Sequence, residues 1–365
     1  MRRALEAGRP VVVKVGSSSL APGDAGLDTD AVRRVVEQVT GLWESGHPTV
    51  LVSSGAVAAG IPVLGSRPSD LPGFQVAAAV GQSRLMERYT ARFAERGLTA
   101  GQVLLTKDVL ANRGQYLNAR ETLTRMLSLG IVPIVNENDS VGVEELRFGD
   151  NDRLAAVVSH LAGAGMLVML TDTPGLYSGD PRFDVDAELI NAVRHTDEAL
   201  DEVVRGVQGP LGSGGVATKV AAARMAAWSG VPTVIADANE PSVVARSVAG
   251  EEIGTWIDPH PTALPARKLW IAFGQPSEGR LTVDPGAGAA LVERGKSLLA
   301  VGVTDVLGEF EAGAAVEVNG PSGVLIAKGL VEQSSDDIAS MAGKASSDAG
   351  GLIIHRDHLV VLSGA

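Results

Sequence analysis

Two stretches of the chain repeat the same order of features, and this repeat restricts the fold more than any other feature. Val11–Val15 is an apolar run that contains one lysine and ends at Gly16, and Thr49–Val52 runs directly into Ser53-Ser54-Gly55. Apolar residues at helical spacing between them predict a helix from Asp28 or Thr29 to about Trp43. Strand, helix and strand in this order predict a parallel sheet covered on both faces, whose ligands bind at the carboxyl edge.

The same reasoning extends over the first two thirds of the chain. It predicts strands at 102–105, 131–135, 166–170 and 231–236, and helices at 75–96, at 118–129 and after 152. Pro133 predicts an irregular strand or one near the sheet edge, because proline cannot donate a ladder hydrogen bond. The strand at 231–236 is expected to be the last one of this region.

Composition excludes several classes of protein. With 365 residues, 45% hydrophobic residues and 44 glycines, the chain fits a closely packed α/β enzyme with two domains. Its net charge of −12 argues against a general nucleic-acid binder, which needs lysine and arginine to neutralise phosphates. The absence of cysteine excludes disulfides and thiolate metal sites. The apolar run Val11–Val15 is too short to cross a membrane, so we expect a soluble, cytoplasmic protein without a membrane partner.

The composition of the sequence and the kind of predicted elements change after Trp256. Residues 259–276 contain four prolines and a basic pair, which predicts a connecting segment. Short strands are then predicted at 281–283, 314–318, 323–327 and 359–361, between turns that contain glycine. We therefore expect a first domain at 1–258, a linker at 259–276 and a small β-barrel-like domain at 277–365.

Two clusters of acids and amides precede or follow predicted elements. Asp150, Asn151 and Asp152 lie where a helix is predicted to begin. Asn136-Glu137-Asn138-Asp139 follow directly after the predicted strand at 131–135. One aspartate could be only an N-cap, which satisfies an orphan backbone N–H group. A second carboxylate exceeds what a cap needs, so the functional alternative stays open. Asp172, at the end of the strand 166–170, could likewise be only a turn former.

Two lysines accompany predicted turns. Lys14 lies inside a buried strand, where an ammonium group is costly unless it meets an anion or snorkels to water. Lys219 follows Thr218 and a glycine-rich run, which is either a linker or a loop that approaches phosphate. One cleft could collect both lysines and the aspartates, an arrangement that suits phosphoryl transfer. The chain has no Walker sequence, so the ordinary P-loop is excluded.

Six segments in the same order resemble the glutamate 5-kinase family of the amino-acid kinase superfamily. They lie at 12–18, 52–60, 135–139, 148–152, 170–172 and 214–219. The segments 279–289, 295–303 and 308–310 are similar to the PUA domain that many of these kinases carry. The resemblance implies a three-layer αβα sandwich with a mainly parallel sheet and a small C-terminal β-barrel-like domain.

The resemblance also implies the role of each site residue. Lys14 and Lys219 would neutralise the transferred phosphoryl group, and Asp152 would position both lysines. Ser54, Asp139 and Asn151 would bind glutamate, with Asp150 close to its amino group. The residues implied to contact ATP are Lys14, Thr171, Asp172, Ser213, Gly214, Gly215, Val216, Ala217, Thr218 and Lys219. No protein metal site is implied, and Mg²⁺ would be held mainly by ATP.

The reaction implied is ATP-dependent phosphorylation of the glutamate γ-carboxylate, the first step toward proline. Proline feedback, a homo-oligomer (dimer or tetramer) and a downstream reductase partner are further family expectations. Ser213 and Val216 stand where the family often has threonine and methionine, and we expect little effect on activity.

Two rival interpretations remain. One is a related kinase that acts on acetylglutamate, aspartate, carbamate or UMP, although the cluster 136–139 and the C-terminal module favour glutamate. The other is an RNA-binding or RNA-modifying protein with a degenerate kinase scaffold. Residues 277–365 carry six Lys and Arg against twelve Asp and Glu, a net charge of −6 that argues against RNA.

Overall fold

The computed structural model describes residues 2–21, 23, 26–110, 112–141, 151–194, 213–344 and 351–362. The chain divides into two compact units, Met1–Ala263 and Leu264–Ala365. Each unit has its own hydrophobic cluster of buried side chains.

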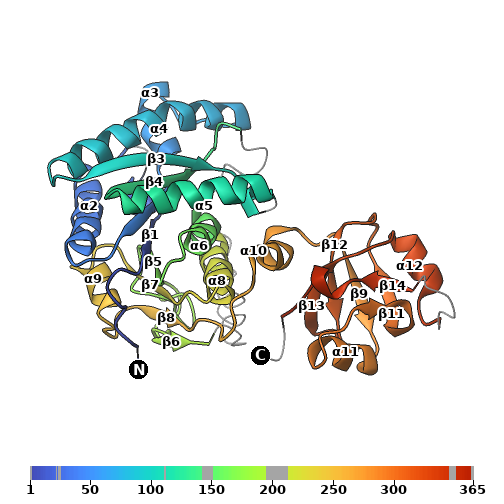
Figure 1. The fold of residues 1–365 in the computed structure, drawn as a ribbon. Helices are drawn as coiled ribbons and strands as arrows, with labels where there is room; N and C mark the ends of the chain where they lie inside the picture. Colours follow the sequence, from blue (N-terminus) through green and yellow to red (C-terminus); the bar gives the residue numbers. More distant parts are fainter. Residues whose placement is uncertain are drawn as a thin grey trace. The chain divides into compact units, whose positions relative to one another are not determined.

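The first unit is built on an eight-stranded sheet with the strand order β3-β4-β2-β1-β5-β7-β8-β6 (Figure 1). All its neighbouring strands run parallel except β7 and β8. The strands are β1 Val11–Val15, β2 Thr49–Ser53, β3 Thr99–Leu105, β4 Ile131–Glu137, β5 Met166–Thr171, β6 Ala192–Val193, β7 Thr233–Asp237 and β8 Thr255–Ile257.

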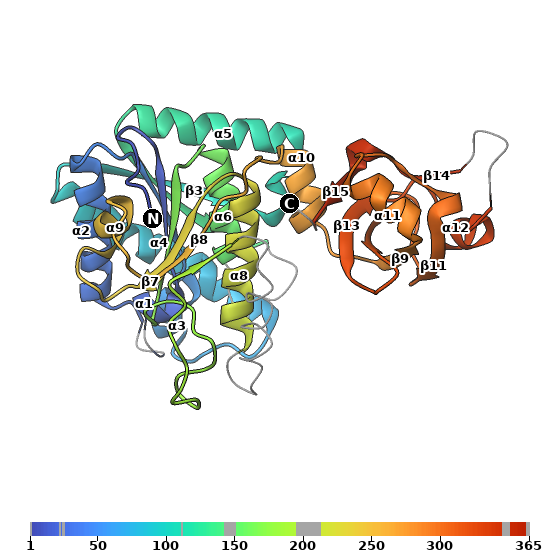
Figure 2. The ribbon, with the colours of Figure 1, turned by 90° about the horizontal axis from the view of Figure 1, so that it is seen from below.

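Helices cover both faces of this sheet (Figure 2). One layer contains α2 Thr29–Glu44, α4 Leu71–Ala94 and α9 Val243–Val248, and the other contains α5 Arg113–Ser128, α6 Asn151–Leu161 and α8 Ser213–Trp228. The short α1 Ser17–Leu20, α3 Ala56–Leu64 and the 3₁₀ turn η1 Lys107–Leu110 follow strand ends. The predicted α/β class with a mainly parallel sheet between helical layers is confirmed.

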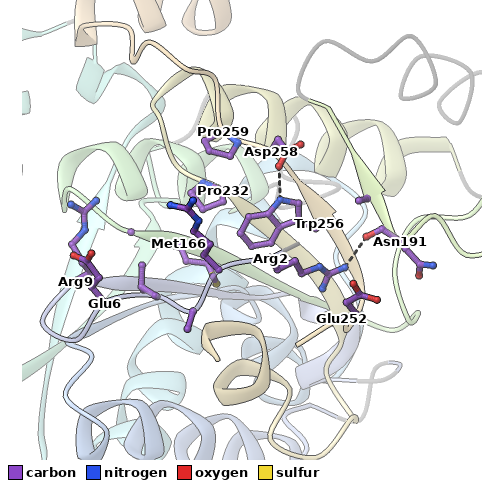
Figure 3. Close-up of a pocket in the computed structure, with 15 residues that line it drawn as sticks. Arg2, Glu6, Arg9, Met166, Asn191, Pro232, Glu252, Trp256, Asp258 and Pro259 are labelled. Atoms are coloured by element: carbon purple, nitrogen blue, oxygen red, sulfur yellow. Dashed lines mark hydrogen bonds between the residues drawn. The ribbon is translucent and has the colours of Figure 1, made fainter. Parts of the chain in front are cut away.

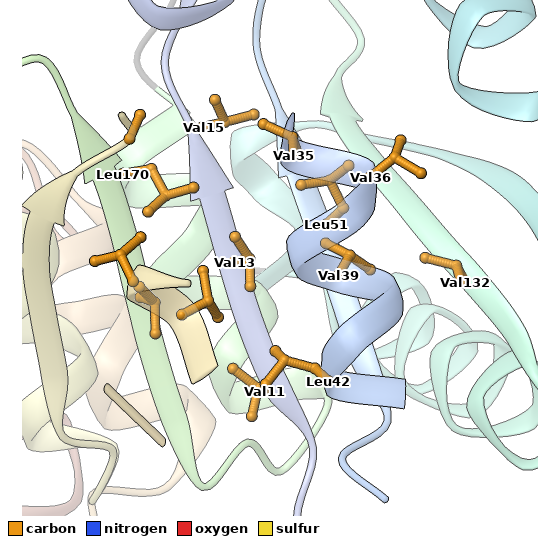
Figure 4. Close-up of a cluster of buried hydrophobic side chains, with 14 of the residues drawn as sticks. Val11, Val13, Val15, Val35, Val36, Val39, Leu42, Leu51, Val132 and Leu170 are labelled. Atoms are coloured by element: carbon orange, nitrogen blue, oxygen red, sulfur yellow. The ribbon is translucent and has the colours of Figure 1, made fainter. Parts of the chain in front are cut away.

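Strand alternation decides which side chains of β1 enter the hydrophobic core. Val11, Val13 and Val15 point to one face, where they meet the buried side of α2: Val35, Val36, Val39 and Leu42 (Figure 4). Because successive side chains of a strand point to opposite faces, Lys14 points to the other face, toward the layer of α6. The lysine therefore does not interrupt the apolar cluster under α2.

The helix α2 forms where its sequence predicts it. Asp28 is the N-cap, and its carboxylate accepts hydrogen bonds from the backbone N–H groups of Asp30 at 2.8 Å and Ala31 at 3.2 Å. Seven of its residues are buried on one side. Capping and amphipathic periodicity therefore agree about this helix.

Some element boundaries differ from the predictions. The helices α4 and α5 begin four to five residues earlier than expected, at an N-cap aspartate, Asp70, and an N-cap asparagine, Asn112. The expectation that the strand at 231–236 ends the sheet is wrong, because β8 pairs antiparallel with β7 and β6 adds a further edge strand. β4 with Pro133 lies one strand in from the edge, between β3 and β2.

The second unit contains a five-stranded sheet, in the order β11-β9-β12-β13-β15, and the small pair β10-β14. Its strands are β9 Gly279–Val283, β10 Leu298–Leu299, β11 Val303–Leu307, β12 Ala315–Asn319, β13 Leu325–Leu330, β14 Leu352–Ile354 and β15 Leu359–Val361. Its longer helices are α11 Pro285–Val292 and α12 Ser335–Met341, and the short turns are η4 Ala300–Gly302 and η5 Arg356–His358. The predicted separate β-rich C-terminal domain is confirmed.

Much of the expected linker 259–276 has regular structure. α10 Ala266–Leu269 and η3 Trp270–Gly274 belong to the second unit, where Ile271 and Ala272 are buried against β12, β13 and β15. Lys328 of β13 donates hydrogen bonds to the carbonyl oxygens of Ala272 and Gln275. Within the described ranges, no helix is both long and apolar enough to cross a membrane.

Candidate active site

The strand order brings the ends of β2, β1 and β5 next to one another at the carboxyl edge of the sheet. The turn after β2 is tied to β1, because the backbone N–H group of Ser54 donates to the Val15 carbonyl oxygen at 3.2 Å. Gly55 begins α3 with a φ of +103°, a left-handed conformation that favours glycine. Lys14, Ser54 and Thr171 thus lie at three neighbouring strand ends.

Two cations that are distant in sequence meet on one carboxylate. Lys14 Nζ forms an ion pair with Asp152 Oδ1, and Lys219 Nζ lies 3.5 Å from Asp152 Oδ2. Thr218 donates its hydroxyl to Asp152 Oδ2 at 3.0 Å, and Lys219 also donates to the carbonyl oxygen of Gly215 at 3.1 Å. The packing of α6 against α8 and β1 therefore produces a cluster of two ammonium groups around one aspartate.

This cluster is largely removed from water. Lys14 is 4% exposed and Asp152 is 2% exposed, whereas the Lys219 side chain is 19% exposed. Burial would raise the pKa of Asp152, but the attraction of Lys14 and Lys219 and the hydrogen bonds from Lys14 and Thr218 outweigh it and lower that pKa below its ordinary value. Asp152 is therefore a carboxylate, not a proton donor, at neutral pH.

The aspartate occupies the first turn of α6, where negative charge also meets the helix dipole favourably. Its carboxylate contacts two lysines and a threonine from other elements, and a helix cap alone does not require these contacts. Asp150, the other carboxylate of the predicted cluster, lies outside the described residues.

Next to Asp152, the buried amide of Asn151 joins three segments. Its Nδ2 donates to the Ser53 carbonyl oxygen at 3.0 Å, to Ser54 Oγ at 3.1 Å and to Asn136 Oδ1 at 2.7 Å. Two residues expected to bind substrate, Ser54 and Asn151, are thus in direct contact. The structure brings them beside the lysine cluster because Asn151 and Asp152 are consecutive.

Asp139 lines a cavity of about 260 Å³ at the ends of β3 and β4. The other residues that line it include Ala56 after β2, Gln82 of α4, Glu137 and Asn138. Gln82 accepts a hydrogen bond from Asn136 Nδ2 at 2.8 Å, so a continuous chain of amides connects this cavity with Asn151.

The residues expected to contact ATP lie in two places along the chain. Thr171 ends β5, and its hydroxyl donates to the carboxylate of Asp172 at 3.0 Å. Residues 213–219, including Ser213, Gly214, Val216 and Ala217, form the first two turns of α8, whose Thr218 and Lys219 reach Asp152.

Sequence reasoning assigned no role to Gln82 and named Asn136 only as part of a cluster. Asn136 is 2% exposed and bridges Asn151, Gln82 and the backbone N–H group of Glu137. Its position one residue before the strand end was a usable signal. The sequence gives no such signal for Gln82, because a glutamine on a helix of small residues is common. Its hydrogen-bond partner, Asn136, lies 54 residues further along the chain.

The donor set near Asp152 does not resemble a protein metal cage. Among the described residues, no three His, Cys, Asp or Glu side chains cluster around a possible metal position. Asp152 is instead surrounded by two cations. This environment fits a divalent cation only as a companion of nucleotide phosphates, which supply most of its oxygen ligands.

A larger cavity of about 580 Å³ lies away from these residues, beside Gly165 and Pro232, which precede β5 and β7 (Figure 3). Arg2 lies in it, donates to the carbonyl oxygens of Asn191 at 2.7 Å and Gly254 at 2.8 Å, and stacks its guanidinium over Trp256. Opposite charges line its wall in equal number: Arg2, Arg3, Arg9, Glu6, Glu252 and Asp258. None of the predicted site residues lies here, so we place the candidate active site at the carboxyl edge.

Comparison with known proteins agrees with this fold. The model of the amino acid kinase family matches residues 9–237, which contain the entire lysine and aspartate cluster, and the model of the PUA domain matches residues 279–349. The chain belongs to the amino acid kinase family.

Curated relatives cover the whole chain. It is similar to the glutamate 5-kinase of Trichlorobacter lovleyi, with 46% identity over 100% of both chains. It is also similar to the glutamate 5-kinases of Pelobacter propionicus, at 45% identity over 96% of this chain and 97% of that one, and of Chromohalobacter salexigens, at 47% over 99% and 98%.

Proposed function

We propose that the protein transfers the γ-phosphoryl group of ATP to the γ-carboxylate of L-glutamate and forms L-glutamyl 5-phosphate, the first step of proline biosynthesis. The observation that carries this proposal is that Lys14 and Lys219 both form ion pairs with Asp152. The chain that holds this cluster is similar over its whole length to glutamate 5-kinases. The acidic chain thus gathers positive charge at one local point.

The chemistry needs positioned cations more than acid–base groups. An oxygen of the γ-carboxylate forms a bond to the γ-phosphorus, the bond from that phosphorus to the bridging oxygen breaks, and ADP leaves with the electron pair. Because the substrate carboxylate is already ionised at neutral pH, no proton must be removed. Lys14 and Lys219 would neutralise the charge that spreads over the transferred oxygens, which is the main stabilisation available to this reaction.

Asp152 has a positioning role in this scheme. It forms ion pairs with both ammonium groups and accepts a hydrogen bond from Thr218, so the two lysines are held at defined positions before the nucleotide binds. Such preorganisation avoids the cost of ordering flexible lysine side chains during the reaction.

The proposed substrate positions come from the likeness to the family, and the two clusters beside the cations support them. Ser54, Asn151, Asp139 and Asp150 would bind glutamate, and Thr171, Asp172 and the segment 213–219 would contact ATP. The hydrogen bonds that join Asn151 to Ser54, and the cavity wall that contains Asp139, support this division.

Mg²⁺ belongs to the proposal as a companion of ATP. When bound, the ion would neutralise phosphate charge, held mainly by the nucleotide. Proline inhibition at or near the glutamate site, a homo-oligomer, a downstream reductase that consumes the product and a cytoplasmic location are also part of the proposal, and all rest on the likeness to the family.

The test is turnover of L-glutamate with ATP and Mg²⁺, with the acyl phosphate trapped by hydroxylamine as a hydroxamate. Aspartate, acetylglutamate and UMP replace glutamate in parallel reactions that are followed by ADP formation, because phosphorylated UMP is not an acyl phosphate and gives no hydroxamate. We expect hydroxamate from glutamate and at least a hundredfold lower kcat/KM for the other acceptors. A folded protein that phosphorylates one of them and not glutamate would reject the assignment.

A further inference from the structure

Gln82 lies in α4, outside the set of residues assigned to substrate or nucleotide. Its Oε1 accepts from Asn136 Nδ2 at 2.8 Å, and Asn136 Oδ1 accepts from Asn151 Nδ2 at 2.7 Å. Asn151 in turn donates to Ser54 Oγ at 3.1 Å. We call this series of side chains, Gln82, Asn136, Asn151 and Ser54, the amide relay.

Two backbone groups fix the direction of every amide in the relay. The Ser53 carbonyl oxygen can only accept, so it must face Asn151 Nδ2, which lies 3.0 Å away. The backbone N–H group of Glu137 can only donate, so it must face Asn136 Oδ1, at 2.9 Å. Asn136 therefore presents its NH₂ group to α4, where it needs an acceptor, and Gln82 supplies one.

The relay leaves Asn151 Oδ1 buried and without a hydrogen-bond partner in the part of the chain that the structure describes. Asn151 itself is only 2% exposed. A buried acceptor without a donor is costly, and such groups are usually satisfied by a ligand or by water. The ammonium group of an amino acid is a donor that would complete this site.

We propose that Gln82 is a positioning residue for the amino-acid substrate: by holding Asn136, it holds Asn151 with its carbonyl oxygen directed toward the substrate. This inference rests on the proposed function. It assigns Gln82 a role through the relay and not through contact with reacting atoms. Gln82 also lines the cavity that contains Asp139, so it links that cavity with Asn151.

The test compares variants that keep or remove the oxygen of Gln82 that accepts from Asn136. Gln82→Met removes the acceptor and keeps the length of the side chain, and Gln82→Glu keeps an acceptor for Asn136. For Gln82→Met we expect the KM for glutamate to rise about tenfold, the size of effect when a buried amide loses its partner. The KM for ATP and kcat should stay within about threefold, because the relay does not include the lysines.

Rescue separates positioning from a general structural role. Gln82→Glu should restore the KM for glutamate to within about threefold of the wild-type value. Asn136→Leu should raise this KM as Gln82→Met does, and the double variant should add little, because both changes break the same path. Glu87→Met, at an exposed position of the same helix, is the matched control and should leave all three constants unchanged.

Several outcomes would overturn the inference. One is an unchanged KM for glutamate in folded Gln82→Met, and another is a loss spread equally over glutamate, ATP and kcat. A Gln82→Glu variant as impaired as Gln82→Met would also do so. If Gln82→Met does not fold, Gln82→Asn carries the test, since it shortens the side chain by one methylene and breaks the 2.8 Å bond.

The wild-type reaction distinguishes the two proposals. If wild-type protein phosphorylates glutamate but the Gln82 variants keep its KM, only the relay inference fails. If wild-type protein phosphorylates no amino acid, the proposed function fails and the inference fails with it.

Discussion

At the scale of single residues, Asp152 is the shared partner of the two lysines in the candidate site. It is a buried carboxylate whose charge is balanced by two cations from β1 and α8. Its removal would leave Lys14 buried at 4% exposure without its anionic partner. Breaking a buried ion pair on one side costs more than the pair contributes when complete.

Asp152→Asn should therefore reduce both activity and stability. We expect the free energy of unfolding to fall by about 3 kcal/mol, as for other buried pairs broken on one side. Chemical denaturation at neutral pH measures this change. Asp180→Asn is the matched control, because the ion pair of Asp180 with Arg182 is on the surface and its loss should change the free energy of unfolding much less.

The difference between wild type and Asp152→Asn should also depend on pH. The folded-state pKa of Asp152 is lowered, so its stabilising contribution is present above the unfolded pKa and is lost as pH falls through the folded one. The difference in Tm should be constant between pH 5 and 7, values chosen above the ordinary carboxyl pKa of about 4, and should shrink below it. A difference that grows as the solution is acidified would contradict this assignment.

Lys219 allows a separate test of the transferred charge. Lys219→Ala should lower kcat about a hundredfold, because its contact strengthens as phosphoryl charge develops, while both KM values change much less. Alanine is a good helix former, so α8 should persist. Steady-state kinetics gives these constants, with Lys296→Ala in the second unit as control, and an unchanged kcat would remove the proposed role.

At the scale of elements, the crossing of α3 and α4 decides where Gln82 lies. A Cβ atom on Gly81 would lie 1.8 Å from the carbonyl oxygen of Ala56, and one on Gly60 would lie 2.0 Å from that of Ala77. Both neighbours are backbone, so they cannot move aside as a side chain could. Two glycines therefore allow the helices to touch, next to the relay and the turn after β2.

Gly81→Ala should separate these helices and destabilise the protein by about 1–3 kcal/mol, as overpacked cores do. Gly41→Ala in α2 is the control, because no atom lies within 4 Å of its added Cβ. This change should stabilise by up to about 1 kcal/mol through helix propensity and a restricted unfolded state. Urea unfolding of both variants measures the contrast, and equal effects would refute the packing argument.

Elements with strong local signals could be predicted from the sequence. The cap at Asp28 and the buried side of α2 gave correct boundaries within a residue or two. The earlier starts of α4 and α5 were missed because polar or exposed residues fill their first turns, so periodicity was weak there. The strands β6 and β8 are two and three residues long, too short for a period to appear.

At the scale of the whole molecule, the described residues of the candidate site all belong to the first unit. The second unit has its own core around Leu281, Val316 and Ile354 and carries a net negative charge. Its cavity of about 730 Å³ is lined by apolar side chains and by charged ones of both signs, such as Asp284, Lys296 and Arg356, but nothing in the structure identifies an occupant.

Binding of the substrates should therefore change amide hydrogen exchange in the first unit and not in the second. With glutamate and a non-hydrolysable ATP analogue, we expect slower amide hydrogen exchange at the turn after β2, at α4 near Gln82 and at the start of α8. Residues 264–344 should show no comparable change. Mass spectrometry of peptides from the intact protein resolves these regions, and protection confined to the second unit would argue against this site.

The sequence by itself determined the class of fold, the longer strands and helices of the first unit, and the residue types placed at their ends, because these depend on local periodicity and turn chemistry. Only the tertiary structure decided which of those residues meet. Lys14 and Lys219 are 205 positions apart, and their common partner follows from the sheet order and from the packing of α6 against α8. The role of Gln82 could be inferred only from its hydrogen bond with Asn136, which lies on another element. A hydrogen bond between distant segments leaves no local pattern in the sequence.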